Sequence, residues 1–190
     1  MRDGTAWVVN SAYIGSELNW DEHLMSQGAE RLTDGGEPRW LALAGWLAVV
    51  ALVALVGSWA TLTKIPTWYA SLAKPSFTPP NAVFGPVWTV LYAMMAVAVW
   101  RVSRADRPMQ RQAIVLFVVQ LALNAIWSPV FFGLEAPRLG LAVILALCVS
   151  LAATLAVFWR VDRLAGLLLV PYLAWVCYAS ALNAAIVVLN

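Results

Sequence analysis

The chain has 190 residues, of which 62% are hydrophobic and 12% are charged, and its mean hydropathy is +0.76. Globular domains carry about 45–50% apolar and about 25% charged residues, so this composition is typical of a membrane protein. The net charge of +2 is too small to indicate a nucleic-acid partner. All ten acidic residues fall outside the long apolar runs, which disfavours a proton-coupled pump or an ion channel.

The first segment, residues 1–39, is polar and carries both signs of charge. It has neither the apolar core of a signal peptide nor the arginine-rich, acid-poor composition of a transit peptide. We expect a flexible or weakly helical cytosolic tail. The single histidine, His23, lies here, which excludes a site built from several histidines.

Five long apolar runs follow the tail, and polar or proline-containing breaks separate them. They cover about 41–62, 83–101, 112–134, 138–159 and 164–189. Each is close to the ~20 residues that a helix needs to cross a ~30 Å hydrocarbon core. Because lipid cannot satisfy backbone polar groups, the spans must be helical. The sequence therefore predicts an all-α membrane protein, a bundle of five transmembrane helices over residues 40–190.

Arginine and lysine are distributed unequally between the two sides of such a bundle. The N-terminus and the breaks after the second and fourth spans share nine arginines: Arg2, Arg31, Arg39, Arg101, Arg104, Arg107, Arg111, Arg160 and Arg163. The other side has only Lys64, Lys74 and Arg138. The positive-inside rule then predicts a bacterial inner-membrane protein whose N-terminus is cytoplasmic.

Other residues of the spans have simple interpretations. Five tryptophans near the span ends fit an interfacial aromatic belt: Trp40, Trp59, Trp68, Trp100 and Trp159.

Cys148 and Cys177 both lie inside apolar runs. We interpret them as small hydrophobic side chains rather than as a disulfide or reactive thiols.

The connection between the first two spans, residues 63–85, is too long for a tight turn. Prolines fix φ and make it stiff, and loops of this length are usually functional lids or disordered. It contains several prolines and aromatic residues, including Trp68, Tyr69, Phe77, Pro79 and Pro80. These favour an ordered lid, and a passive linker is the alternative.

Three spans carry aromatic or amide residues at helical spacing. These residues are Trp88 and Tyr92 in the second span, Gln120, Asn124, Trp127 and Phe131 in the third, and Trp175, Ala179, Leu182 and Asn183 in the fifth. A buried amide needs a polar partner, so the amides either join helices or line a cavity. Tryptophan prefers the bilayer interface, and three tryptophans deep inside their spans favour an aromatic cavity for a large flat ligand.

Four segments carry a resemblance to one family, in order and at matching spacing. They read WYASLAKPSFTPP from Trp68, PVWTVLY from Pro86, NAIWSPVFFG from Asn124 and VPYLAWVCYASALN from Val170. This pattern resembles the TspO/translocator proteins, also called tryptophan-rich sensory proteins, from about residue 41 to the end.

The resemblance implies a homodimer of five-helix subunits, each with a lidded pocket for protoporphyrin IX or haem-related tetrapyrroles, and no cofactor beyond that ligand. The implied pocket residues are Trp88, Tyr92, Asn124, Trp127, Phe131, Trp175, Ala179 and Leu182. Phe77 departs from the family pattern, which usually has tryptophan at this place.

Three functions are compatible with the resemblance. The first is a sensor or transporter that binds tetrapyrroles. The second is a light- and oxygen-dependent enzyme that degrades porphyrin, in which Trp88 and Trp175 would take part because no acid–base pair or activated nucleophile lies in the spans. The third is a sterol or lipid carrier, which is disfavoured because the last span lacks the tyrosine and basic residue of the animal proteins' sterol motif.

Overall fold

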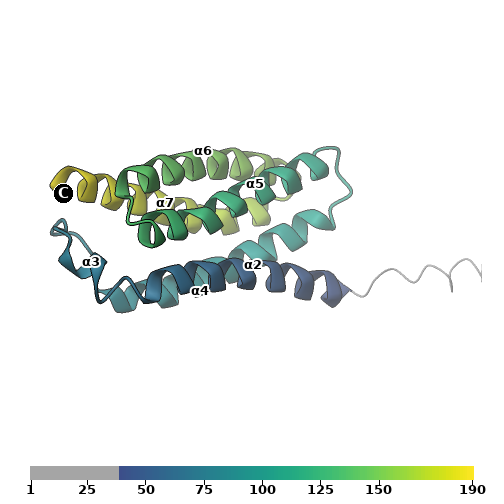
Figure 1. Ribbon diagram of the computed structural model, residues 1–190. Coiled ribbons are helices and arrows are strands. Elements are labelled where there is room, and N and C mark those ends of the chain that lie inside the picture. The colour runs from purple at the N-terminus through teal and green to yellow at the C-terminus, as the bar shows by residue number, and fades with distance from the viewer. Residues whose placement is uncertain (1–38) are drawn as a thin grey trace, which may run out of the picture. The chain divides into compact units, whose positions relative to one another are not determined.

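The computed structural model describes the chain from Arg39 to Asn190, so the predicted tail lies outside the described residues. Five long helices run alongside one another in this part (Figure 1). They are α2 (Arg39–Leu62), α4 (Asn81–Ser103), α5 (Gln110–Ser128), α6 (Pro137–Val161) and α7 (Arg163–Leu189). A short helix α3 (Trp68–Ser71) and a π-helical turn η1 (Pro129–Gly133) complete the described elements.

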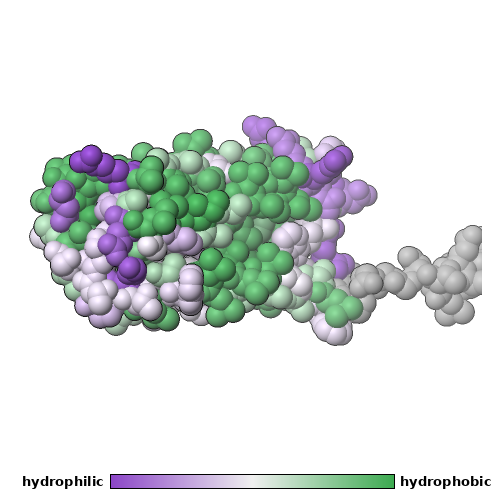
Figure 2. All heavy atoms as spheres, viewed as in Figure 1, coloured by the Kyte–Doolittle hydropathy of each residue, from purple (hydrophilic) through white to green (hydrophobic). Residues whose placement is uncertain are grey.

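Each of the five helices has the length and apolar composition needed to cross a membrane. This confirms the predicted fold class, an all-α membrane protein. Figure 2 shows hydrophobic residues over the middle of the visible face and hydrophilic residues towards its two ends. One boundary differs from the prediction, because α4 begins at Asn81 and its first turn is helical directly after Pro80. The connection between the first two spans is therefore 63–80 rather than 63–85.

Four of the helices form a closed ring in which α4 contacts α7 and α5, and α6 lies between α5 and α7. The centre of the ring is filled by large side chains that are completely buried, including Met95, Phe117, Leu151 and Tyr172. Ala96 and Ala98 on α4 are also fully buried. Such small residues let the backbones of neighbouring helices approach closely, which drives helix association in lipid.

Helix α2 is attached to this ring much less tightly. Only Val50 and Ala60 are buried along its length, whereas Leu52, Leu55 and Trp59 are largely exposed. An apolar helix with so little buried surface would be unstable in water, but hydrocarbon solvates its outer faces in a membrane. The lipid environment therefore accounts for a helix that is apolar on all sides.

Proline shapes the end of α5. Leu134 donates a backbone hydrogen bond to the carbonyl of Pro129 over 2.9 Å, a five-residue step that defines the π-helical turn. The wider turn buries two successive aromatic residues, Phe131 and Phe132. A short loop then reaches α6 through Glu135, whose φ of 53° is unusual for a residue with a Cβ atom.

A single residue, Asp162, joins α6 to α7 and caps α7. Its carboxylate accepts a hydrogen bond from the Ala165 backbone N–H at 3.0 Å and pairs with Arg101 of α4 at 2.7 Å. Burial by itself would raise the pKa of Asp162, but the backbone hydrogen bond and the Arg101 guanidinium outweigh it and lower that pKa. The charged form therefore fastens α4 to the start of α7.

Candidate ligand cavity

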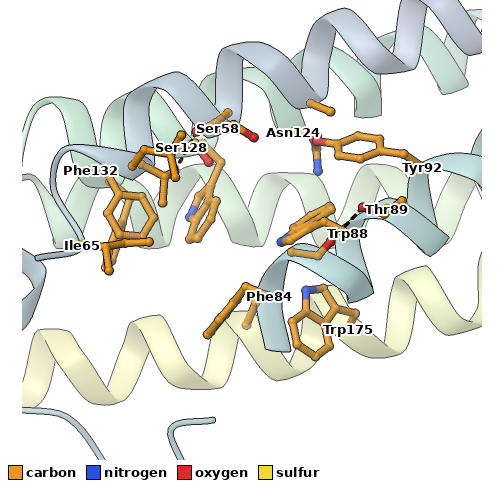
Figure 3. A pocket seen from close by; sticks show the side chains of 18 of the residues that line it. Ser58, Ile65, Phe84, Trp88, Thr89, Tyr92, Asn124, Ser128, Phe132 and Trp175 are labelled. Carbon is orange, nitrogen blue, oxygen red and sulfur yellow. Dashed lines mark hydrogen bonds between the residues drawn. The ribbon is translucent and has the colours of Figure 1, made fainter. Parts of the chain in front are cut away.

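The described residues enclose a cavity of about 730 Å³ between α2, α4, α5, η1 and α7, with α3 and the connection before it at one end. Figure 3 shows its wall, where Trp88 and Phe84 of α4 lie close to Trp175 of α7. All eight residues that the sequence proposed for ligand binding line this one cavity. They are Trp88, Tyr92, Asn124, Trp127, Phe131, Trp175, Ala179 and Leu182.

Aromatic rings contact one another around the wall. The ring centroids of Trp88 and Tyr92 are 5.4 Å apart, as the i, i+4 spacing predicts. Phe84 meets Trp175 edge-on with a centroid distance of 5.8 Å. These contacts hold the rings in fixed orientations, so the wall offers flat, pre-arranged apolar faces.

A hydrogen-bonded chain of polar groups joins three helices where Tyr92 and Asn124 meet the cavity. The Tyr92 hydroxyl donates to Asn124 Oδ1 over 2.7 Å, and Asn124 Nδ2 donates to the Tyr172 hydroxyl over 2.9 Å. Both alternatives for this amide therefore apply, because Asn124 links α4, α5 and α7 and also lines the cavity. Its polar atoms are already used within the protein.

The second amide of the wall, Asn183, is also fixed on both of its polar atoms. Its Nδ2 donates to the carbonyl of Pro137 over 2.8 Å, and its Oδ1 accepts from Trp127 Nε1 over 3.4 Å. The indole of Trp127 is therefore held in place. Gln120, which precedes Asn124 by one turn, is completely buried but does not line the cavity.

Trp175 differs from Asn124 and Asn183, and resembles Gln120, whose two polar atoms are also buried without a partner among the described residues. The Nε1 atom of its indole is buried and makes no hydrogen bond within the described residues, although its ring faces the cavity (Figure 3). A buried N–H without an acceptor costs about 1–3 kcal/mol. The Trp175 N–H is therefore a donor without an acceptor in a residue that lines the cavity.

Three sets of contacts fasten the connection between α2 and α4 across the end of the bundle. Lys64 forms an ion pair with Glu135 at 2.6 Å, and the Tyr178 hydroxyl donates to the carbonyl of Phe77 over 2.7 Å. The Asn190 side chain accepts from the Ala73 N–H at 3.0 Å and donates to the Ala73 carbonyl at 3.1 Å. This connection is ordered, as a lid would be.

Only one of the five residues proposed for the lid reaches the cavity, and that residue is Tyr69. Trp68 does not line the cavity and packs edge-on against two residues that do. Its ring centroid lies 5.7 Å from that of Phe131 and 6.4 Å from that of Phe132. Phe77 packs on Tyr178, and half of its surface is exposed. Pro79 and Pro80 do not line the cavity either, so they shape the connection before α4.

Sequence reasoning missed the contribution of α2. Eight of its residues line the cavity: Leu47, Val50, Ala51, Ala54, Gly57, Ser58, Thr61 and Leu62. They recur at spacings of three and four, and most are small, so they share one face of the helix. This face did not stand out in the sequence, because the first apolar run has no polar or aromatic stripe that distinguishes one face from another.

No charged side chain of the described part lines the cavity, and no three metal-ligating side chains gather in residues 39–190. The wall combines indole, phenol and phenyl faces with three amides, Asn81, Asn124 and Asn183, and with the unpartnered indole N–H of Trp175. Such a wall suits an organic ligand that is mainly apolar and carries hydrogen-bond acceptors. The fold and the cavity define a multi-pass membrane protein with an aromatic intramembrane pocket.

Comparison with known proteins places this architecture in a family. The TspO/MBR family profile matches residues 46–189, and the chain therefore belongs to the TspO/MBR family. It is 41% identical to the tryptophan-rich protein TspO of Archaeoglobus fulgidus over 148 residues, which cover 78% of this chain and 95% of the relative. It is 39% identical to the human translocator protein over 151 residues, which cover 77% and 88% of the two chains.

A third relative carries a name that refers to a cellular role. The tryptophan-rich sensory protein of Cereibacter sphaeroides is 39% identical over 141 residues, which cover 73% of this chain and 88% of the relative. All three alignments are long enough to include most of the five spans. The resemblance stated from four sequence segments is thus confirmed at the level of the family.

Proposed function

We propose that this protein binds tetrapyrroles such as protoporphyrin IX in the cavity between α2, α4, α5 and α7, and acts as their sensor or transporter. The observation that carries the proposal is an aromatic cavity of about 730 Å³ between the membrane-spanning helices. Pockets for organic ligands usually measure about 300–1,000 Å³ and are mostly apolar. A porphyrin is a flat, apolar ring system that stacks well on indole and phenol faces.

The carboxylates of the porphyrin find suitable partners at the lid end. Lys64 and Lys74 are the two lysines of the connection between α2 and α4. The Lys74 ammonium lies 4.8 Å from the centroid of Tyr69, and Tyr69 lines the cavity. Because Lys64 is paired with Glu135, the propionates would point towards Lys74 and away from the hydrocarbon core when the ring lies among the tryptophans.

A cavity-filling variant tests the proposal. Ala179→Phe places a ring in the space that the porphyrin would occupy, because Ala179 lines the cavity. Ala153→Phe is the matched control, since Ala153 is exposed on α6. In the dark, titration of the purified protein with protoporphyrin IX should give saturable binding that is lost in the first variant and kept in the second.

Two results would overturn the proposal. One is the absence of saturable binding at micromolar porphyrin by the natural protein. The other is unchanged binding by Ala179→Phe while the circular dichroism of both variants matches that of the natural protein. The same titration repeated in light detects the enzymatic alternative, because degradation would remove the porphyrin absorbance band over time.

A further inference from the structure

Two thiols meet on the side of the molecule that the cavity does not use. The sulfur atoms of Cys148 on α6 and Cys177 on α7 are 3.4 Å apart and share a hydrogen bond. Both cysteines are free, and neither lines the cavity. The sequence favours small hydrophobic side chains at these two positions, because both lie inside apolar runs that carry no activating charge.

The depth of the pair in the bundle is set by the helices that carry it. Cys148 stands near the middle of α6 (Pro137–Val161) and Cys177 near the middle of α7 (Arg163–Leu189). Cys177 is exposed on the surface of the bundle, and Cys148 is half-buried beside it. At mid-span this surface faces hydrocarbon. The pair is thus open to molecules dissolved in the lipid and shielded from those in water.

We propose that Cys148 and Cys177 form a redox site that reduces apolar hydroperoxides in the membrane and closes a disulfide between α6 and α7. The more exposed sulfur, Cys177, attacks the terminal oxygen of the hydroperoxide. The O–O bond breaks, an alcohol leaves, and Cys177 becomes a sulfenic acid. The Cys148 sulfur then attacks the Cys177 sulfur, the S–S bond forms, and water leaves.

The two steps balance without a further reactant. Two thiols supply two electrons and two hydrogens, which appear in the alcohol and in the water. Reactants and products are all neutral, so no separated charge remains in the hydrocarbon after the exchange. The sulfur atoms are already in contact, and α6 and α7 pack closely along their length. Closure therefore needs only a small movement of two side chains.

The experiment treats the full-length protein in lipid nanodiscs, in the dark and without porphyrin, with cumene hydroperoxide, which partitions into lipid. Intact mass should fall by about 2 Da, the two hydrogens lost to the disulfide, and neither thiol should react with a maleimide when the treated protein is unfolded in SDS. Hydrogen peroxide at the same concentration should act more slowly, because it stays in water. The absence of porphyrin keeps this test independent of the proposed function.

Single variants assign the order of the two steps. In Cys148→Ala, the exposed Cys177 should accumulate as a sulfenic acid that dimedone traps. In Cys177→Ala, the half-buried Cys148 should react several-fold more slowly. Both thiols remaining reactive with maleimide after treatment would overturn the proposal. So would a disulfide found only between two copies of the chain on a non-reducing gel.

Discussion

The polar side chains of the cavity wall differ in how many of their polar atoms have hydrogen-bond partners. Asn124 and Asn183 are each bonded on both polar atoms, whereas the indole N–H of Trp175 is buried without an acceptor. A residue that is already satisfied contributes shape, and one that is unsatisfied contributes a directional contact to a ligand. Trp175 is therefore the residue at which polar recognition of a ligand is expected.

We predict that Trp175→Phe weakens binding of protoporphyrin IX by roughly 5- to 30-fold, because it removes the free N–H, worth about 1–2 kcal/mol, and keeps an aromatic ring. Trp46→Phe is the control, since Trp46 packs edge-on against Phe117 at 5.7 Å and does not line the cavity. Absorbance titration measures both affinities. Equal weakening by the two substitutions would contradict the assigned role of the Trp175 donor.

Gly140 illustrates a close approach between α6 and η1. A Cβ atom there would lie 2.9 Å from Cδ2 of Phe131 and 3.2 Å from Oδ1 of Asn183. We predict that Gly140→Ala destabilises the protein by about 1–3 kcal/mol, because it overpacks the wall between two fixed residues. Thermal unfolding in detergent measures the change. Gly133→Ala, where nothing lies within 4 Å of the new atom, should leave the midpoint unchanged within error.

At the scale of elements, the described helices are joined by polar contacts at the ends of the bundle and by apolar packing between them. At one end Asp162 caps α7 and pairs with Arg101 of α4. At the other end Lys64 and Asn190 fasten the connection between α2 and α4. Each of these groups lies where water reaches the protein, so charge and pH influence the helix ends rather than the spans.

The lowered pKa of Asp162 gives a pH dependence with a defined sign. A carboxylate whose pKa is lower in the folded state stabilises the protein above its unfolded pKa of about 3.9, and this stabilisation is lost as the pH falls through the folded value. We predict that Asp162→Asn lowers the thermal midpoint at pH 7 and flattens its fall below about pH 4. Asp106→Asn, in the loop between α4 and α5, serves as the control.

The contacts of the connection between α2 and α4 predict an effect on dynamics. Asn190→Ala removes the two hydrogen bonds to Ala73, and Glu135→Gln removes the ion pair with Lys64. We expect faster amide hydrogen exchange over residues 65–80 in both variants and little change within α6, because local opening depends on these contacts. Arg138→Gln is a control at the same end. Unchanged exchange in the lid would show that packing of Trp68 and Tyr69 alone holds it.

At the scale of the whole molecule, the unequal charge of the two ends predicts its orientation in a membrane. The end of the bundle where α4 meets α5 and α6 meets α7 carries Arg104, Arg107, Arg111, Arg160 and Arg163 in addition to the paired Arg101. Cytoplasmic segments of membrane proteins are enriched in such residues. The N-terminus should therefore be cytoplasmic and the C-terminus should face the opposite side.

A reporter fused to the C-terminus tests this orientation. Alkaline phosphatase, which is active outside the bacterial cytoplasm, should be active when it follows Asn190, and green fluorescent protein should be dark there. Replacing Arg104, Arg107 and Arg111 by glutamine should produce a mixed orientation, because it removes much of the charge bias. Glutamine at Lys64, Lys74 and Arg138 should leave the orientation unchanged. The reverse pattern of reporter activity would contradict the assignment.

The sequence by itself determined the class of fold and the family. Five apolar runs of sufficient length leave a helical bundle as the physical solution in lipid, and their ends differ from the observed helices by only a few residues. Helical spacing also grouped Trp88 with Tyr92 and Asn124 with Trp127, since residues three and four apart share a face. Six of the eight proposed cavity residues are aromatic or carry an amide, and Ala179 and Leu182 were added by their helical spacing from Trp175 and by the resemblance. Ligand binding by these residues, the homodimer and the tail at residues 1–39 stay predictions.

Only the tertiary structure decided which helix faces meet. The small residues of α2 line the cavity although its sequence is apolar on every side, and Trp68 and Phe77 pack away from the cavity although they belong to the proposed lid. The contact between Cys148 and Cys177 joins residues on different helices. Local sequence fixes the faces of one helix relative to each other, but the register and rotation of two helices depend on the packing of all their side chains together. That is why the pattern found the members of the site, and the fold was needed to show which of them leave a polar atom free.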